Sequence, residues 1–161
     1  MARKRLHTVM MGGALAFATL AGGATPASAA PFYTDSGLPQ SSTAMRGIGC
    51  AGEVWGNARV WHNLPYKSGN VTFTVLGSLK FLGIQAPWCD VTPTVRWRNL
   101  TTGAAGSRSV NLMAPAEVPD FFGMPVPKRG EADIRTGKGR VEVRLDTDLP
   151  HSPSVTTITV D

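Results

Sequence analysis

Hydrophobic and polar residues alternate with a period of two along much of the chain after residue 50, which is typical of half-buried β-strands. The clearest case is residues 91–113, where Val95 and Trp97 share one face of a first run and arginines and threonines occupy the other. After a glycine-bearing turn, Val110 and Leu112 continue the pattern. We expect a β-hairpin here, and other strands must close over its apolar face because a hairpin cannot bury that face alone.

Further runs of the same type predict strands at residues 53–61, 70–76, 132–136, 141–145 and 155–160. A shorter apolar run at 79–84 is compatible with a strand or with a turn of helix. No run has the 3.6-residue period of an amphipathic helix. About seven short strands with turn signals at this spacing predict an antiparallel β-sandwich of immunoglobulin-like type. A small closed β-barrel is the alternative.

The runs at 132–136 and 141–145 predict a second hairpin. A four-residue loop at 137–140 keeps Ala132, Ile134 and the apolar residues of the return run on one face. It also places Asp133 opposite Arg144 and Arg135 opposite Glu142, and such opposite charges favour this register over a two-residue loop.

Residues 1–29 have the features of a signal peptide: basic residues at positions 3–5, an apolar stretch, and an Ala-x-Ala pattern that ends at Ala29. We therefore expect a secreted protein cleaved after Ala29, with no transmembrane segment. Residues 30–49 show no period and predict an N-terminal tether. The β-sandwich domain is expected at 50–161.

Cys50 and Cys89 are the only cysteines, and in an exported chain they predict one structural disulfide. The formal net charge of +5 includes three positive charges of the leader, so the remaining chain is only mildly basic. That balance predicts no nucleic-acid partner. A domain of this size needs no metal or cofactor to fold, and none is expected.

One face of the 53–61 run is the first candidate for binding. Trp55, Asn57, Arg59 and Trp61 alternate with small apolar residues, and this set suits a sugar ring stacked on indole or a protein partner anchored by Trp and Arg. The alternative is that other chain covers this face, since tryptophan is usually mostly buried. The remaining tryptophans are expected in packing roles, Trp97 in the core and Trp88 beside the disulfide.

The segment 114–130 is the second candidate. Its four prolines exclude a regular strand or helix interior, yet it carries Phe121, Phe122 and Met124. A long apolar loop of this kind is either a binding loop or a plug over an open core.

Catalytic and metal motifs are weak. The chain has no G-x-S-x-G elbow, and of its histidines only His62 and His151 lie outside the leader. Asp146 and Asp148 with His151 could offer oxygen ligands to Ca²⁺, but acidic residues at a solvated strand end explain them more simply. No catalytic, cofactor or metal residue is predicted.

Residues 95–106, Val-Arg-Trp-Arg-Asn-Leu-Thr-Thr-Gly-Ala-Ala-Gly, and 137–143, Gly-Lys-Gly-Arg-Val-Glu-Val, resemble hairpins of small exported β-sandwich proteins of actinobacteria. That resemblance implies an all-β fold and export. It implies no activity and no site residue, because its motifs are turn chemistry.

The sequence therefore favours a secreted, non-enzymatic β-sandwich that binds a protein or glycan partner outside the cell or belongs to the cell envelope. A secreted inhibitor of proteases or glycosidases, presenting the 114–130 loop, is one alternative. The other is a small secreted hydrolase, which would hold His62 or His151 within reach of an acid or a hydroxyl.

Overall fold

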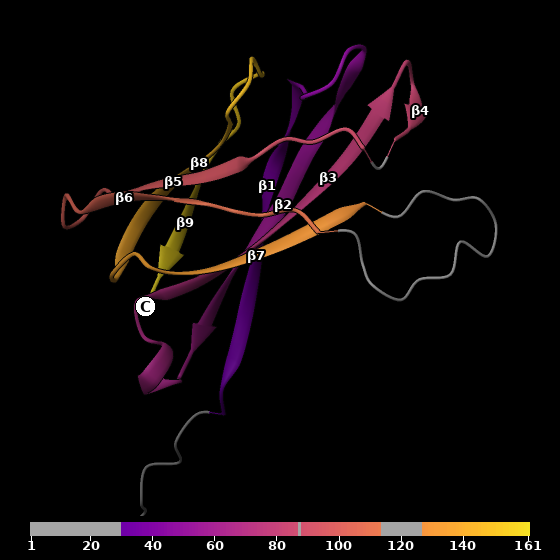
Figure 1. Ribbon diagram of the computed structural model, residues 1–161. Helices are drawn as coiled ribbons and strands as arrows, with labels where there is room; N and C mark the ends of the chain where they lie inside the picture. Colours follow the sequence, from indigo (N-terminus) through magenta and orange to yellow (C-terminus); the bar gives the residue numbers. More distant parts are fainter. Residues whose placement is uncertain (1–29, 87, 114–126) are drawn as a thin grey trace, which may run out of the picture.

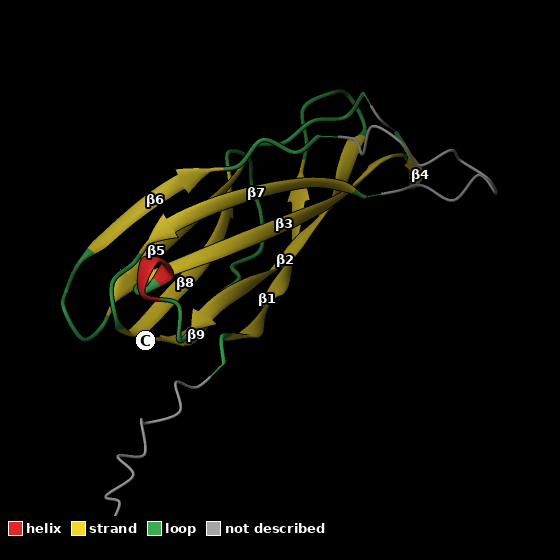
Figure 2. Ribbon diagram, turned by 90° about the horizontal axis from the view of Figure 1, so that it is seen from below, coloured by secondary structure: helices red, strands yellow, loops and turns green. Residues whose placement is uncertain are grey.

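Two antiparallel β-sheets face each other in the computed structural model, which describes residues 30–86, 88–113 and 127–161. The first sheet contains β1 (Phe32–Ala44), β2 (Cys50–His62), β3 (Asn70–Phe81), β4 (Ile84–Gln85) and β7 (Lys128–Arg135), with β4 and β7 both paired to β3. The second sheet has the order β6 (Ala105–Ser109), β5 (Pro93–Asn99), β8 (Gly139–Thr147), β9 (Val155–Val160). Figures 1 and 2 show the two layers. The expected all-β, sandwich-like architecture is confirmed.

The core lies between the sheets and is built from alternate residues of each strand. Val54 and Ala58 of β2, Phe73 of β3, Val95 of β5 and Val143 of β8 are fully buried. Each large apolar side chain removed from water in this way contributes about 1.5–3 kcal/mol to folding. The period-two assignment of inward residues is thus confirmed for the runs that begin at 53, 70 and 141.

Helical structure among the described residues is limited to one 3-10 turn, η1 (Pro65–Lys67). Across these same residues, no helix has the length and apolar character needed to cross a membrane. The run at 79–84, for which a strand and a turn of helix were both possible, contains no helix: it comprises the end of β3, a turn, and the start of β4.

The hairpin expected at 91–113 is present, with Trp97 opposite Gly106 and Thr94 opposite Ser109. The return strand is shorter than expected and ends at Ser109. Val110 nevertheless points into the core, and its N–H donates to the Pro93 carbonyl at 2.9 Å.

The prediction of a tether at 30–49 is wrong for most of its length, because β1 pairs with β2 from Phe32 opposite His62 to Ala44 opposite Ala51. The register shifts between Leu38 and Ser41, which breaks any period in the sequence.

The inward positions of β1 beyond that shift are also polar, which hid the strand from a hydrophobic pattern. The fully buried Ser41 hydroxyl donates to the Ser152 carbonyl at 2.6 Å, so its burial carries little penalty. The buried Ser154 in turn donates to the Pro39 carbonyl at 2.6 Å.

The prediction of a second hairpin is also wrong. β7 pairs with β3, whereas β8 pairs with β5 and β9, so the chain crosses between the sheets at 136–138. Asp133 consequently lies opposite Thr72, and Glu142 lies opposite Arg98. The inward positions Ala132 and Ile134 are correct, because both a corner and a hairpin keep them on the core side.

The side chain of Asn99 explains why a corner forms here. Its amide nitrogen donates to the carbonyls of Thr136 at 3.1 Å and Lys138 at 2.8 Å, and its oxygen accepts from the N–H groups of Thr101 and Thr102. Asn99 is fully buried. Backbone groups that a hairpin partner would satisfy are thus satisfied by one amide, which removes the penalty of leaving them unpaired.

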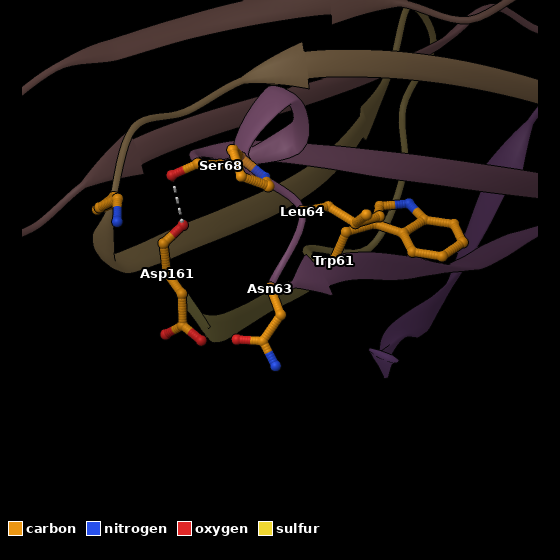
Figure 3. A pocket seen from close by; sticks show the side chains of 7 residues that line it. Trp61, Asn63, Leu64, Ser68 and Asp161 are labelled. Atoms are coloured by element: carbon orange, nitrogen blue, oxygen red, sulfur yellow. Dashed lines mark hydrogen bonds between the residues drawn. The ribbon is translucent and has the colours of Figure 1, made fainter. Parts of the chain in front are cut away.

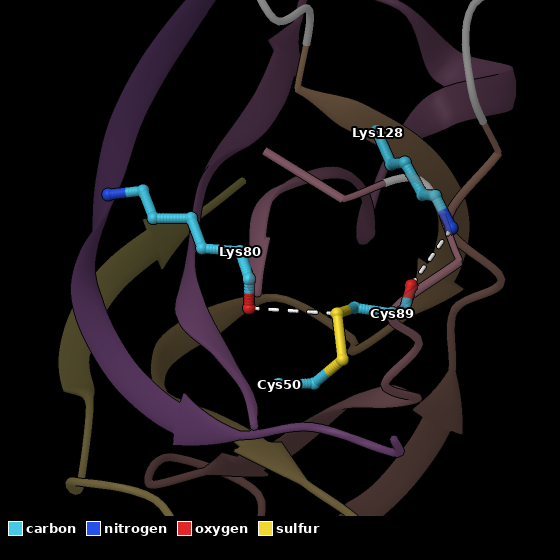
Figure 4. The surroundings of a disulfide bond; sticks show 4 residues. All are labelled: Cys50, Lys80, Cys89 and Lys128. Carbon is cyan, nitrogen blue, oxygen red and sulfur yellow. Dashed lines mark hydrogen bonds between the residues drawn. A yellow bond between two sulfur atoms is a disulfide. The ribbon is translucent and has the colours of Figure 1, made fainter. Parts of the chain in front are cut away.

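Cys50 and Cys89 form the expected disulfide, with 5.7 Å between their Cα atoms. It joins the start of β2 to the segment that leads into β5, and therefore connects the two sheets (Figure 4). The Cys89 carbonyl accepts a hydrogen bond from Lys128 Nζ at 3.3 Å.

Trp88, expected to pack beside this disulfide, is instead 69% exposed. Its neighbour Cys89 is fully buried, so at this point of the chain Cys89 faces the core and Trp88 faces outward. Trp97 is partly buried and packs against the core from β5, close to the expected position.

We expect Asn99→Ala to lower the free energy of unfolding by about 2–4 kcal/mol, because it leaves buried carbonyl and N–H groups without partners. Denaturant unfolding followed by tryptophan fluorescence measures this loss. Asn111→Ala, at an exposed position, is the matched control and should change stability by less than about 0.5 kcal/mol. Equal losses in the two variants would show that the corner does not depend on the Asn99 amide.

Candidate functional site

The outer face of the first sheet carries the first predicted set of binding residues. Trp55, Asn57, Arg59 and Trp61 alternate with the buried Val54, Ala58 and Val60 of β2, and each of the four is partly exposed. β1 adds Tyr33, opposite Trp61, and Asp35, opposite Arg59. We call these six residues, from Tyr33 to Trp61 on the two strands, the aromatic face.

Arg59 occupies the centre of the aromatic face in a fixed position. Its Nε and one terminal nitrogen donate to the two Asp35 oxygens at 2.8 and 2.9 Å. Its guanidinium carbon lies 4.1 Å from the Tyr33 ring centroid and 6.0 Å from that of Trp61. The Tyr33 and Trp61 rings are themselves 5.3 Å apart, edge to face. Ion pairing and cation–π contact thus hold the guanidinium, which leaves Trp61 with a defined orientation.

The ion pair also sets the charge state of both groups. The hydrogen bond from Arg59 lowers the pKa of Asp35 below its ordinary value of 3.8, although burial acts in the opposite direction. The same bond raises the pKa of Arg59. Both groups therefore carry full charge at neutral pH.

A hollow of about 380 Å³ lies beside Arg59 on this face, and we call it the face hollow. It is lined by Asn57, Arg59, Trp61, Thr72, Thr74, Leu76, Arg129 and Glu131. Thr74 donates to Glu131 at 3.4 Å, and Glu131 is paired with Arg129, so the polar wall opposite Trp61 is held by its own contacts. An indole wall facing amide, hydroxyl and charged groups is suited to a ligand with apolar faces and a polar rim.

A second hollow, the end hollow, has a volume of about 370 Å³ and lies where β2 ends. It is lined by Trp61, Asn63, Leu64, Pro65, Ser68, Lys138 and Asp161. Figure 3 shows Trp61 and Asp161 on opposite sides of it, with Ser68 donating to the Asp161 carbonyl at 3.4 Å. Trp61 lines both hollows and therefore lies between them.

His62 lies on the opposite, inner side of β2 and links a hydroxyl to a carboxylate. Its Nε2 is 2.9 Å from the Thr34 hydroxyl, and its Nδ1 pairs with the Asp161 carboxylate. The Phe32 ring stacks on the imidazole at 4.5 Å. A histidine within reach of a hydroxyl and an acid is the arrangement expected of a hydrolase, so His62 carries the second candidate function below.

Asp146 and Asp148, the possible Ca²⁺ ligands of the sequence, pair with different partners. Asp146 pairs with Arg96 at 2.8 Å and lies 3.4 Å from His151 Nε2. Asp148 instead pairs with Arg46 and accepts from the Thr92 N–H at 2.9 Å. Within the described part of the chain, no three His, Cys, Asp or Glu side chains gather as metal ligands would.

Phe121, Phe122 and Met124 fall at 114–126, outside the described residues, so their assignment to a binding loop stays a prediction. Sequence reasoning missed Tyr33 and Asp35, because it read their segment as a tether. It also missed Arg129 and Glu131, because it placed Arg129 in the 114–130 loop and began the strand at 132, whereas β7 begins at Lys128. The spacing of Tyr33 and Asp35, two residues apart, was the one available signal that they share a strand face.

Comparison with known families found no matching family model, and searches of curated proteins and of solved structures found no match either.

We expect NMR titration to give Asp35 a pKa below 3.8, and Arg59→Gln to raise it toward that value. Because folding lowers this pKa, the ion pair stabilises the fold above the unfolded-state pKa, and the contribution is lost as pH falls through the folded-state pKa. The effect on stability is small, since both side chains are 37% exposed and screened by solvent.

Arg135→Gln is the control for this titration, because Arg135 lies opposite Asn70 at the other edge of the sheet. It should leave the pKa of Asp35 unchanged. An Asp35 pKa that does not respond to Arg59→Gln would mean that the ion pair is absent in solution.

Proposed function

We propose that the protein is an exported, non-enzymatic binding protein that holds a glycan chain across Trp61. One observation carries this proposal: Trp61 lines both the face hollow and the end hollow. Two adjoining hollows that share one tryptophan match two successive sugar units, with its ring stacked against one of them.

The lining chemistry favours a glycan over a protein partner. A pyranose ring has apolar C–H faces and a rim of hydroxyl groups, which donate and accept hydrogen bonds. The hollows offer an indole together with the Asn57 and Asn63 amides and the Glu131 carboxylate. Their volumes of about 370 and 380 Å³ lie at the small end of the range for ligand pockets, as sugar-sized sites require.

Arg59 supports the proposal by being occupied already. Its Nε and one terminal nitrogen are bonded to Asp35, and its guanidinium lies over the Tyr33 ring. A protein-binding hot spot would use a free arginine as an anchor. Here the arginine instead braces a rigid aromatic surface, which lowers the ordering cost of binding a small ligand.

Export is supported by the leader-like residues 1–29 and by the Cys50–Cys89 disulfide, a bond typical of oxidising compartments. We further infer the immunoglobulin-like type from the crossing pattern: β7 returns to pair with β3, while β6 and β8, its neighbours along the chain, belong to the other sheet. The resemblance to small exported actinobacterial proteins stays a prediction.

The test is a calorimetric titration of the oxidised protein with neutral oligosaccharides of hexose and N-acetylhexosamine units. We expect Trp61→Ala to weaken binding at least about 30-fold, the loss of a central aromatic anchor. Trp88→Ala, at a tryptophan remote from both hollows, is the matched control and should bind as the wild type does. Failure of every oligosaccharide to bind, or equal affinity of the two variants, would refute glycan binding at this face.

A hydrolase is the second candidate, because Thr34, His62 and Asp161 have the order of a nucleophile, a base and an orienting acid. It ranks below binding because Thr34 lies within a continuous strand. Successive N–H groups of a strand point in opposite directions, so they cannot converge on one oxyanion.

We expect Thr34→Val and His62→Gln to leave the hydrolysis of p-nitrophenyl acetate at the wild-type rate. Thr72→Val, another strand threonine, serves as the reference variant. If both substitutions lower the rate at least about 100-fold and Thr72→Val does not, the hydrolase becomes the better assignment. The inhibitor alternative depends on residues 114–126 and stays a prediction.

A further inference from the structure

The end of the sandwich that carries the disulfide exposes several large apolar side chains. Ile48 is 96% exposed, Leu82 76%, Ile84 74% and Trp88 69%. We call these four residues the apolar tip. Figure 1 shows the turn between β3 and β4 projecting at this end, away from the C-terminus.

Contacts along the backbone bring the four residues of the tip together. The Leu82 N–H donates to the Gly49 carbonyl at 3.2 Å, which joins the turn before β2 to the turn after β3. Phe81 lies opposite both Cys50 and Ile84, and its ring centroid is 6.3 Å from that of Trp88. The disulfide then ties Trp88, through Cys89, to the residue that follows Gly49.

The residues of the tip contradict ordinary turn chemistry. Ile48 stands between Gly47 and Gly49, which have φ of 111° and 75°, so the backbone holds an isoleucine at the apex of a glycine turn. Leu82 adopts φ of 47°, a left-handed conformation that costs a residue of this type about 1–2 kcal/mol. Polar residues or glycine would occupy such positions at lower cost. Aliphatic side chains here gain nothing from the core, so another contact must account for them.

The shape and charge of the tip indicate what that contact is. Ile48, Leu82 and Trp88 project from turns and Ile84 from the start of β4, so the exposed apolar side chains gather at one end of the sandwich, away from the flat faces of its sheets. This placement suits insertion into a deformable apolar phase. Tryptophan and aliphatic residues with a basic rim are the composition of segments that enter a membrane interface.

Two lysines supply the basic rim. Lys80 of β3 is directed away from the disulfide (Figure 4) and pairs with no acid among the described residues. Lys128 is anchored on the Cys89 carbonyl beside the tip. The nearby Asp90 pairs with Arg46 at 2.8 Å, and Arg46 also pairs with Asp148, so these three groups together carry one negative charge, which the two lysines outweigh. The tip therefore carries net positive charge, which is complementary to anionic headgroups.

We infer that the apolar tip inserts into a lipid surface that carries anionic headgroups. The Leu82–Gly49 hydrogen bond joins the two turns and the disulfide holds Trp88 beside them before binding, so little conformational freedom is lost on insertion. The tip is separated from Trp61 by almost the full length of β2, roughly 35 Å at the usual rise per residue. Anchoring at one end of the sandwich thus leaves the proposed glycan site at the other end free.

Vesicle binding tests the inference on the oxidised protein. Vesicles of phosphatidylcholine alone and of phosphatidylcholine with 30% phosphatidylglycerol are compared by co-sedimentation. Brominated lipid reports the depth of Trp88 by quenching its fluorescence. We expect partitioning into the anionic vesicles, with quenching that Trp88→Phe removes. Ile48→Ser with Leu82→Ser should weaken partitioning at least tenfold, and Lys80→Gln should weaken it about fivefold on anionic vesicles only.

Trp61→Ala is the matched control, since it should lose glycan binding and keep vesicle binding. The two proposals can therefore fail separately. Thermal unfolding of the Ser variants checks that they fold, and stability should be kept because the replaced side chains are exposed. Absence of partitioning, or partitioning that the Ser variants retain, would overturn the lipid assignment. A dimer that Leu82→Ser abolishes, without vesicle binding, would assign the tip to a second copy of the chain instead.

Discussion

The crossing from β7 to β8 is the constraint on which the two-sheet arrangement depends. At this corner the buried Asn99 amide donates to the Thr136 and Lys138 carbonyls, while the Gly69 carbonyl accepts from the N–H groups of Thr136 and Gly137 at 3.0 Å. With the corner satisfied, β7 is free to complete the first sheet beside β3 and β8 to occupy the centre of the second. A hairpin at the same place would put β7 and β8 in one sheet and leave β3 with an open edge.

The division of residues between the two sides of β2 follows from this enclosure. Once the second sheet covers the inner side, only small apolar residues such as Val54 and Ala58 fit there at close packing. The large side chains of Trp55 and Trp61 are left on the outside. β1 then brings Tyr33 and Asp35 alongside, which converts a row of exposed residues into a braced surface. The candidate glycan site is therefore a consequence of how the core is packed.

One strand also relates the two proposed contacts. β2 begins at Cys50, beside the apolar tip, and reaches Trp61 next to its other end. β2 is paired on both sides, with β1 and β3, and is therefore stiff, so the backbone sets the distance between the proposed lipid contact and the proposed ligand contact. An envelope protein with this geometry would present its ligand site well clear of the lipid headgroups.

Local alternation in the sequence was enough to determine the fold class, the inward positions of the strands that begin at 53, 70 and 141, the hairpin at 91–113 and the outward set from Trp55 to Trp61. The presence of only two cysteines was enough to determine the Cys50–Cys89 bond. Alternation could not determine β1, because a register shift and buried serines remove the period, nor the partners of β7 and β8, because a corner and a hairpin place the same residues inward. It also missed the exposure of Trp88, which depends on the path of the connection from β4 in the first sheet to β5 in the second. Each strand's inward face is decided by neighbouring residues in the chain, whereas its partners, and the hollows and exposed tip they create, are decided by contacts between residues far apart in sequence.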